Sequence, residues 1–277
     1  MEAGKPFEQV RLSSDEYRQF QRFIFDAAGI TLSANKTALV SGRLSRRLRH
    51  WGLTSYEAYL RLLESDRVPD ERQTAIDLLT TNETYFFREP VHFHALREEA
   101  EAARRDAPFR VWSAACASGE EAYSIAMVLA DVLGDAPWDV LGTDISMRAL
   151  ERAATGHYQI ERAERIPPEY RQRYCLKGTG QQDGTLLVAR PVRRRVRFGQ
   201  VNLNAALPAM AAFDVIFLRN VMIYFSGETK AAVAERVLER LNPGGCLIVG
   251  RSESLHGTVD GLEAVMPSVY RKRSAPA

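Results

Sequence analysis

The chain has 277 residues, of which 45% are hydrophobic and 26% are charged; this composition excludes a disordered or fibrous protein and predicts one large domain or two of ordinary size. Its 37 basic and 35 acidic residues leave a formal net charge of only +2, so a protein that binds polyanions over its whole surface is not indicated. The three cysteines are widely spaced, which predicts a protein of the reducing cytoplasm without disulfides or a cysteine zinc site. The sequence has no apolar run long enough to span a membrane and no apolar stretch near the N-terminus, so direct membrane insertion is not expected.

Residues 1–80 are predicted to form a small helical domain. The polar start at Ser14, the apolar residues that recur after it at helical spacing and the stop at Gly29 indicate a first helix. Further helices are expected over residues 33–51, 55–64 and 69–79. Residues 81–108 are expected to link this domain to the next.

The pattern changes at Phe109, where short and nearly all-apolar runs begin to alternate with helical segments. Such runs are typical of buried parallel strands, and their alternation with helices predicts a doubly wound α/β sheet over residues 109–277. Strands are expected at 110–116, 138–144, 213–218 and 246–249, helices at 119–133, 146–155 and 230–241, and a turn at 242–245. Short strands at 174–176, 186–188 and 196–198 around a glycine-rich turn predict a small antiparallel β insertion at about 156–200.

Two features fall at the expected carboxyl ends of neighbouring strands, where open α/β sheets bind ligands. The first is a turn of small residues, from Ala115 to Gly119, that leads into a helix and lets the backbone approach a ligand closely. The second is Asp144, at the end of the next strand. A carboxylate in that place can accept two hydrogen bonds from a ribose diol.

The turn is not a GxGxxG motif, because Glu120 and Glu121 follow Gly119 directly. Two carboxylates at a helix N-terminus would repel a pyrophosphate, which disfavours NAD and FAD. They favour a positively charged adenosine cofactor without phosphates, and S-adenosylmethionine fits that description. The alternative is that both acids only complement the helix dipole. A Walker loop, an HExxH motif and a GxSxG motif are all absent from the sequence, so the corresponding enzyme classes lack support.

Four co-linear stretches resemble the motifs of CheR chemotaxis-receptor methyltransferases. They read LLTTNETYFFRE (78–89), WSAACASGEEAYS (112–124), GTDIS (142–146) and FLRNVMIYF (217–225). The resemblance covers essentially the whole chain, including the helical domain and the β insertion. It implies a class I methyltransferase-like fold and methylation of receptor glutamates by S-adenosylmethionine, with methyl esters and S-adenosylhomocysteine as products, in sensory adaptation.

The resemblance also implies a set of cofactor-binding residues. Between the two adjacent acids, Glu121 is favoured over Glu120, and Asn202 and Leu203 are expected to flank the adenine. The full expected set is Asn82, Thr84, Arg88, Glu121, Asp144, Asn202, Leu203, Arg219 and Asn220.

The chemistry expected of this site needs no general base. A glutamate carboxylate has a reference pKa of about 4.3 and is already ionised at neutral pH, so catalysis consists mostly of orientation. Arg88 is the candidate cation that holds the carboxylate, with an ion pair to Glu89 or Glu121 as its structural alternative. Tyr224 is the candidate hydrogen-bond donor, with core packing as its alternative. The histidines lack the spacing of a metal site, so no metal is expected.

Two basic regions are candidate partner surfaces. Arg43, Arg46, Arg47 and Arg49 lie in a stretch without acids and are the candidate residues for docking on the acidic cytoplasmic domain of a chemoreceptor. Arg43, Arg46, Arg47 and His50 are expected to project from the side of the helix away from its apolar face; the alternative is an ordinary solvated face. Residues 162–197 carry ten basic and three acidic residues. In some members of the family the β insertion binds the receptor's C-terminal peptide at a sheet edge; here the bland alternative is that basic residues keep an edge strand soluble.

Two other functions compete with receptor methylation. A nucleic-acid methyltransferase would need a pocket for a flipped base and usually a base-activating motif, and neither is evident. A non-catalytic module that only senses the cofactor would have no reason to keep Arg88, Asp144 and Tyr224 together. A monomer that does not bind nucleic acid is therefore expected.

Overall fold

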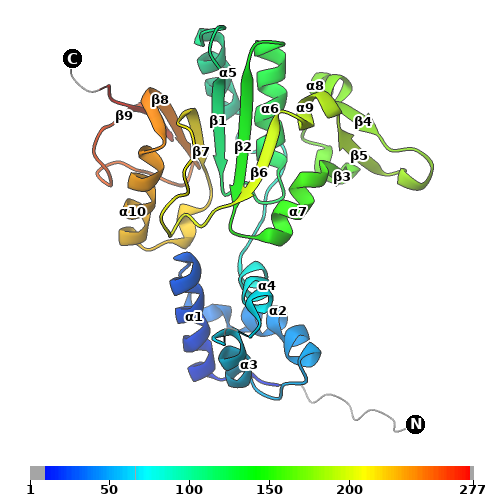
Figure 1. The fold of residues 1–277 in the computed structure, drawn as a ribbon, viewed down its shortest axis with the longest axis vertical. Coiled ribbons are helices and arrows are strands. Elements are labelled where there is room, and N and C mark those ends of the chain that lie inside the picture. The colour runs from blue at the N-terminus through cyan, green and yellow to red at the C-terminus, as the bar shows by residue number, and fades with distance from the viewer. Residues whose placement is uncertain (1–9, 66, 275–277) are drawn as a thin grey trace. The chain divides into compact units, whose positions relative to one another are not determined.

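The computed structural model describes residues 10–65 and 67–274, and the chain divides into two compact units at Thr81. The first unit is built from helices that can be followed in Figure 1. They are α1 (Ser14–Ala28), the 3₁₀ turn η1 (Ala34–Lys36), α2 (Thr37–His50), α3 (Tyr56–Leu63) and α4 (Pro69–Leu79). The helices predicted from the sequence are confirmed, with ends that shift by a few residues.

The first helix shows how local sequence sets an element. Ser13 caps α1 by accepting a hydrogen bond from the Glu16 backbone N–H at 3.2 Å, and the Glu16 carboxylate accepts one from the Ser13 N–H at 2.8 Å. This reciprocal pair satisfies donors that a helix start leaves unpaired. Gly29 ends the helix with a φ of 71°, a conformation that glycine adopts without strain.

The basic face of α2 differs from the expectation. Arg47 donates from Nε to Oε1 of Glu71 at 2.8 Å, and the Tyr59 hydroxyl donates to the same oxygen at 2.5 Å. Glu71, on α4, is only 4% exposed, and a buried carboxylate needs a counter-ion. Arg43 likewise turns inward, to the carbonyl oxygens of Leu79 and Thr80.

The expectation of a basic side free to dock is therefore wrong for Arg43 and Arg47, because they bond to neighbouring segments of the same unit. Arg46 and His50, expected on the same side, are exposed, and so is Arg49.

The second unit is built on a seven-stranded sheet with the order β6-β2-β1-β7-β8-β10-β9. The first five strands of that order run parallel, and β10 is antiparallel to both of its neighbours, β8 and β9; this arrangement confirms the doubly wound α/β fold. The strands are β1 (Phe109–Ala114), β2 (Trp138–Asp144), β6 (Val196–Gln200), β7 (Phe213–Leu218), β8 (Leu241–Val249), β9 (Leu262–Met266) and β10 (Val269–Lys272).

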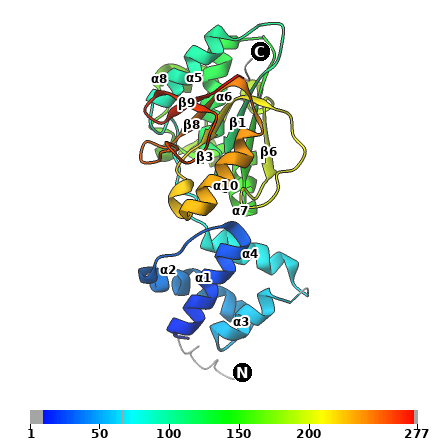
Figure 2. The same ribbon diagram turned by 90° about the vertical axis from the view of Figure 1, so that its left-hand side faces the viewer.

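Four longer helices accompany the sheet and can be followed in Figures 1 and 2. They are α5 (Val91–Ala102), α6 (Glu120–Leu133), α7 (Met147–Thr155) and α10 (Gly227–Leu238). Helix α6 is buried along most of its length, and α5 joins the same core through Phe93, Leu96 and Ala100. Those three residues recur at helical spacing, a signal for α5 inside residues 81–108, where no element was expected.

The β insertion forms a second, antiparallel sheet, as predicted, with the order β3-β5-β4, in which strand β3 was not expected. It lies to the right of the main sheet in Figure 1. Its elements are β3 (His157–Gln159), η2 (Ile160–Ala163), α8 (Pro168–Tyr174), β4 (Cys175–Lys177), η3 (Gly180–Gln182), β5 (Thr185–Val188) and α9 (Arg190–Arg193).

Two strand assignments are corrected. Residues 196–198, expected in the insertion, belong to β6, because Val196 pairs in parallel with Val140 of β2. Residues 242–245, expected as a turn, lie within β8, because Leu241 already pairs with Phe213 and an irregular register absorbs the glycines that follow. Within the described residues, no helix combines the length and the apolar character needed to cross a bilayer.

A buried histidine connects α5 to the far end of the sheet. His92 is completely buried; its Nε2 lies 2.8 Å from the Ser268 hydroxyl, and its Nδ1 lies 3.3 Å from Glu89 Oε2. Burial and the nearby Arg219 lower the pKa of His92 to about 4. The folded protein therefore holds this imidazole neutral at pH values where the unfolded chain protonates it.

His92 should make the free energy of unfolding decrease as the pH is lowered through a defined window. Below its unfolded pKa of about 6.5, unfolding takes up one proton, so the free energy of unfolding should drop by about 1.4 kcal/mol per pH unit down to about pH 4. Urea unfolding followed by tryptophan fluorescence at pH 7 and pH 5 should show a loss about 2 kcal/mol larger in the wild type than in His92→Gln. An equal loss in both proteins would contradict the assignment.

Candidate active site

The sequence-predicted cofactor residues lie on segments that meet at the carboxyl edge of the main sheet. Asp144 ends β2, residues 202 and 203 follow β6, and residues 219 and 220 follow β7. Hydrogen bonds tie residues 82–89 to the same edge, from Asn82 Nδ2 to Asp144 Oδ1 at 3.4 Å and from Arg219 to the Arg88 carbonyl oxygen. Carboxyl ends of parallel strands next to a reversal of strand order are where this fold class places its ligands.

Asp144 is held in place by backbone donors. Its Oδ2 accepts the Ala117 N–H at 2.8 Å and its Oδ1 accepts the Ser146 N–H at 2.9 Å. The carboxylate is 6% exposed. An ionised carboxylate offers about four acceptor positions, and these backbone bonds fix its orientation.

The backbone around this edge is strained. Positive φ values occur at Phe87 (53°), Glu89 (59°), Ala115 (69°), Ala117 (49°) and Asn220 (56°). Residues other than glycine rarely adopt this conformation. Where they do, contacts with the surrounding structure hold the backbone in it, often at ligand sites. All five residues belong to the segments that carry the expected cofactor residues.

Both acids at the start of α6 are paired with arginines. Glu120 is completely buried and accepts from Arg162 Nε at 2.8 Å and from the Ser118 hydroxyl at 2.7 Å. Glu121 accepts from the Ser113 hydroxyl at 2.7 Å and from Arg219 Nη1 at 2.9 Å.

Exposure separates the two acids. The side chain of Glu121 is 12% exposed and that of Glu120 is 0% exposed. Burial raises the pKa of Glu121, so a cationic ligand group that approaches this carboxylate would stabilise its charged form. These observations support Glu121 as the acid available to a ligand.

Arg219 is the centre of the ionic network after β7. Its side chain is 1% exposed and bonds to Glu121, to Glu89 Oε2 at 3.0 Å and to the Arg88 carbonyl oxygen. Hydrogen bonds from Arg219 outweigh the effect of burial and lower the pKa of Glu89. Arg219 therefore joins three segments of the site from below the surface.

The segment that follows Arg219 is anchored by Glu253. This carboxylate is 7% exposed and accepts backbone N–H groups from Asn220 at 2.7 Å, Gly250 at 2.8 Å and Ile223 at 3.3 Å. Sequence reasoning missed Glu253, and it likewise missed Glu89 and the inward position of Arg162. A charged residue far along the chain carries no local signal that it will be buried against these partners.

Asn202 and Leu203 lie directly after β6. The Val201 N–H donates to the Asp144 carbonyl oxygen at 3.1 Å, which holds their segment beside the end of β2. Asn202 Oδ1 accepts the Asn204 N–H at 3.0 Å, and Leu203 is 7% exposed.

Arg88 and Tyr224, the candidate catalytic residues, are both partly exposed. Arg88 Nη1 lies 3.3 Å from the Glu83 carbonyl oxygen, and its guanidinium lies 5.6 Å from the centre of the Tyr85 ring. Within residues 10–65 and 67–274, no ion pair occupies Arg88, so the alternative of a pair with Glu89 or Glu121 gains no support. Tyr224 ends the 3₁₀ turn η4 (Met222–Tyr224) after β7.

The residues present fit a phosphate-free adenosine cofactor. Asp144 and Glu121 supply carboxylate acceptors suited to a diol and an ammonium group, and the strained turn at Ala115 and Ala117 places only methyl side chains there. In the described parts of the chain, no cluster of three or more metal-binding side chains forms.

Known proteins resemble this chain over nearly its whole length. Residues 82–270 match the family described as CheR methyltransferase, SAM binding domain, and residues 15–80 match the CheR methyltransferase all-alpha domain. The chain is 44% identical over 250 residues to the chemotaxis protein methyltransferase of Escherichia coli K12, covering 89% of this chain and 87% of the relative. The Salmonella typhimurium protein of the same name is 41% identical over 266 residues (95% and 92%), and chemotaxis protein methyltransferase 2 of Pseudomonas aeruginosa is 38% identical over 267 residues (95% and 95%).

These matches agree with the four motifs, the mixed sheet and the carboxylates at its carboxyl edge, and they confirm the resemblance seen in the sequence. The chain belongs to the CheR methyltransferase family, and its cofactor is S-adenosylmethionine.

Proposed function

We propose that this chain transfers the methyl group of S-adenosylmethionine to glutamate side chains in the cytoplasmic domain of chemoreceptors, forming glutamate methyl esters. The observation that carries the proposal is the meeting of Asp144, Glu121 and the segment of Arg88 at one edge of the sheet. Relatives of almost equal length are named chemotaxis protein methyltransferases, which favours a receptor as substrate.

The site would orient its two reactants rather than move protons. When bound, the cofactor supplies a methyl group on a sulfonium, which is a good leaving group. Asp144 would hold the ribose diol, Glu121 the ammonium group, and Asn202 and Leu203 the adenine edge, while Asn82, Thr84, Arg219 and Asn220 complete the walls. Arg88 and Tyr224 would hold the receptor carboxylate in line with the methyl group.

This assignment requires no general base. The receptor carboxylate already carries its charge, so accepting a methyl group from the bound cofactor would need no proton removal. The remaining task is to hold an anion close to the methyl group without protonating it. A guanidinium suits this task because it donates to both carboxylate oxygens and keeps its own proton.

Replacing Arg88 should impair turnover. Arg88→Ala should lower kcat for receptor methylation about 100-fold, the usual cost of a lost charge-stabilising donor. The measurement is transfer of labelled methyl groups to receptor membranes, with release of the label by base as the signature of an ester. Arg104→Ala, a matched change at an exposed arginine paired with Asp106, should leave the rate unchanged.

One result would count against the role of Arg88 and another against the function itself. Near-normal ester formation by Arg88→Ala would remove Arg88 from the mechanism. Wild-type protein that binds the cofactor but labels no receptor, or that labels nucleic acid stably to base, would overturn the choice of substrate.

The exposed part of the basic helix α2 is proposed to dock on the receptor. Arg46 and Arg49 remain exposed on a helix whose neighbouring sequence, residues 27–56, contains no acid. An acidic helical surface beside the methylated glutamate is the complementary partner. Arg43 and Arg47 stabilise the unit itself and are not part of this surface.

A charge reversal tests the docking surface. Arg46→Glu should lower kcat/KM for receptor by about fivefold or more and leave cofactor affinity and stability unchanged. Arg47→Met should instead reduce the free energy of unfolding by about 3 kcal/mol, because Glu71 would remain buried without its counter-ion. Thermal unfolding and cofactor calorimetry separate the two effects, and equal losses of receptor and cofactor binding in Arg46→Glu would exclude docking.

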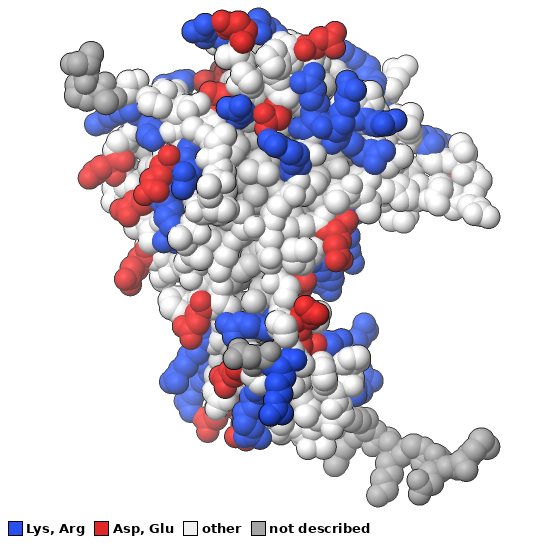
Figure 3. All heavy atoms as spheres, viewed as in Figure 1, with Lys and Arg blue, Asp and Glu red and all other residues white. Residues whose placement is uncertain are grey.

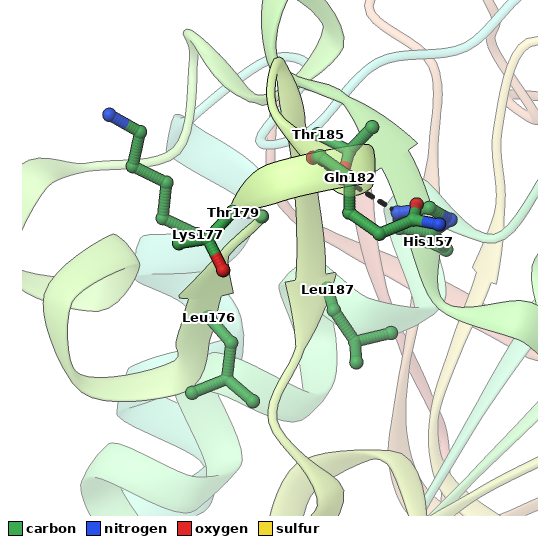
Figure 4. Close-up of a pocket in the computed structure, with 8 residues that line it drawn as sticks. His157, Leu176, Lys177, Thr179, Gln182, Thr185 and Leu187 are labelled. Carbon is green, nitrogen blue, oxygen red and sulfur yellow. Dashed lines mark hydrogen bonds between the residues drawn. The ribbon is translucent and has the colours of Figure 1, made fainter.

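The β insertion is proposed to bind the receptor's C-terminal peptide. A pocket of about 450 Å³ opens on this insertion, lined by residues of β3, β4 and β5 and of the turn between β4 and β5 (Figure 4). Strand β4 is an edge strand, and its Leu176 is 57% exposed. The edge offers unpaired backbone groups to an added strand and the pocket offers apolar contacts. Basic side chains gather over the end of this unit that carries α8 and α9 (Figure 3), and Lys177 adds a cation at the pocket itself.

A single substitution in the pocket tests peptide binding. Leu176→Lys should weaken binding of a synthetic peptide with the cognate receptor's C-terminal sequence about tenfold, measured by calorimetry, without changing cofactor affinity. Val265→Lys, at an equally exposed apolar residue on β9 (54%), is the matched control. No peptide binding by the wild type, or equal binding by both variants, would reject the pocket as the peptide site.

A further inference from the structure

Arg162 connects the β insertion to two separate segments of the cofactor site. It lies in η2, directly after β3. Its Nε donates to Glu120 Oε1 at 2.8 Å, and its Nη2 donates to the same carboxylate, to the Ser118 hydroxyl at 3.3 Å and to the Thr84 carbonyl oxygen at 3.2 Å. Thr84 and the turn around Ser118 belong to separate segments of the chain, and a single guanidinium bridges them.

The environment of this contact makes it more than a surface ion pair. Glu120 is 0% exposed, so its charge depends on the hydrogen bonds it receives. The Arg162 side chain is 44% exposed and approaches from outside, with its guanidinium turned in. The planar fork of an arginine can donate to three acceptors at once, which the ammonium group of a lysine on its flexible stem does not reproduce.

A second side chain of the insertion supports the same turn. The Tyr158 hydroxyl donates to the Ser118 carbonyl oxygen at 2.8 Å, and its ring packs edge to face on Phe86. The turn itself contains Ala117, with a φ of 49°, and Gly119, with a φ of 92°. Strained turns persist only where surrounding contacts over-determine them, and here the insertion provides two of those contacts.

We propose that Arg162 is a positioning residue for the cofactor, which fixes the separation between Thr84 and the turn at Ser118–Gly119. This makes the β insertion a structural wall of the cofactor site as well as a candidate partner surface. The inference rests on the proposed function in one respect, namely that S-adenosylmethionine binds at this edge. Arg162 would contact neither reactant but would set the distance between the two segments that line the cofactor site.

Cofactor calorimetry on the full-length chain tests the proposal. Arg162→Met should raise the Kd for S-adenosylmethionine about tenfold or more, the usual loss when a buried polar network is broken, with a smaller change in kcat at saturating cofactor. Arg162→Lys keeps the charge but not the bridge, so it should recover only part of the affinity. Arg194→Met, at an exposed arginine of the same region, should bind like the wild type.

A double variant separates positioning from the cost of an unpaired buried charge. In Glu120→Gln combined with Arg162→Met, the isolated carboxylate is gone, so thermal stability should rise relative to Arg162→Met. The bridge to Thr84 remains broken, so cofactor affinity should stay low. Recovery of wild-type affinity by the double variant, or an unchanged Kd in Arg162→Met, would overturn the role of Arg162. Failure of the wild type itself to bind S-adenosylmethionine would instead reject the proposed function.

Discussion

The second unit depends on the neutralisation of two adjacent carboxylates at the start of α6. Glu120 and Glu121 are both withdrawn from solvent, and neither could remain charged there without a counter-ion. The counter-ions come from two separate later segments of the chain, Arg162 from the β insertion and Arg219 from the end of β7. Each arginine then uses its remaining donors on the segment that contains Thr84 and Arg88. The need to pair two buried charges thereby draws four chain segments together at one edge of the sheet.

Much of the fold could be predicted because several of its strands have a recognisable local sequence pattern. The runs that became β1 and β7 are mostly apolar, as expected of strands covered on both faces. The errors occur where pairing decides the outcome. The sequence pattern of Val196 and its neighbours is equally compatible with a strand of the insertion. Only their pairing with Val140 assigns them to the main sheet. The glycines after Leu241 suggest a turn, and only pairing with Phe213 carries the strand through them.

The site shows the same division between local and long-range information. Asp144 could be placed from topology alone, because the end of the second parallel strand lies beside the end of the first. The partners of the buried arginines could not be predicted, since Glu89 lies 130 residues from Arg219 and Glu120 lies 42 residues from Arg162. The same limit explains why Arg47 was expected on the surface. A helical wheel shows which side of α2 is polar, but it does not show that the buried Glu71 of α4 faces that side.

The paired acids also resolve an electrostatic conflict in the proposed reaction. The site must hold a cationic cofactor and yet admit an anionic substrate carboxylate. Without counter-ions, the carboxylates of Glu120 and Glu121 would attract the first and repel the second, because charges a few ångströms apart interact strongly in a poorly solvated site. Arg162 and Arg219 balance the charges of the two glutamates and leave their oxygens as directed acceptors. With the interior balanced in this way, the partly exposed Arg88 bonds to the Glu83 carbonyl oxygen rather than to an internal acid, and in the proposed reaction its positive charge would face the incoming carboxylate.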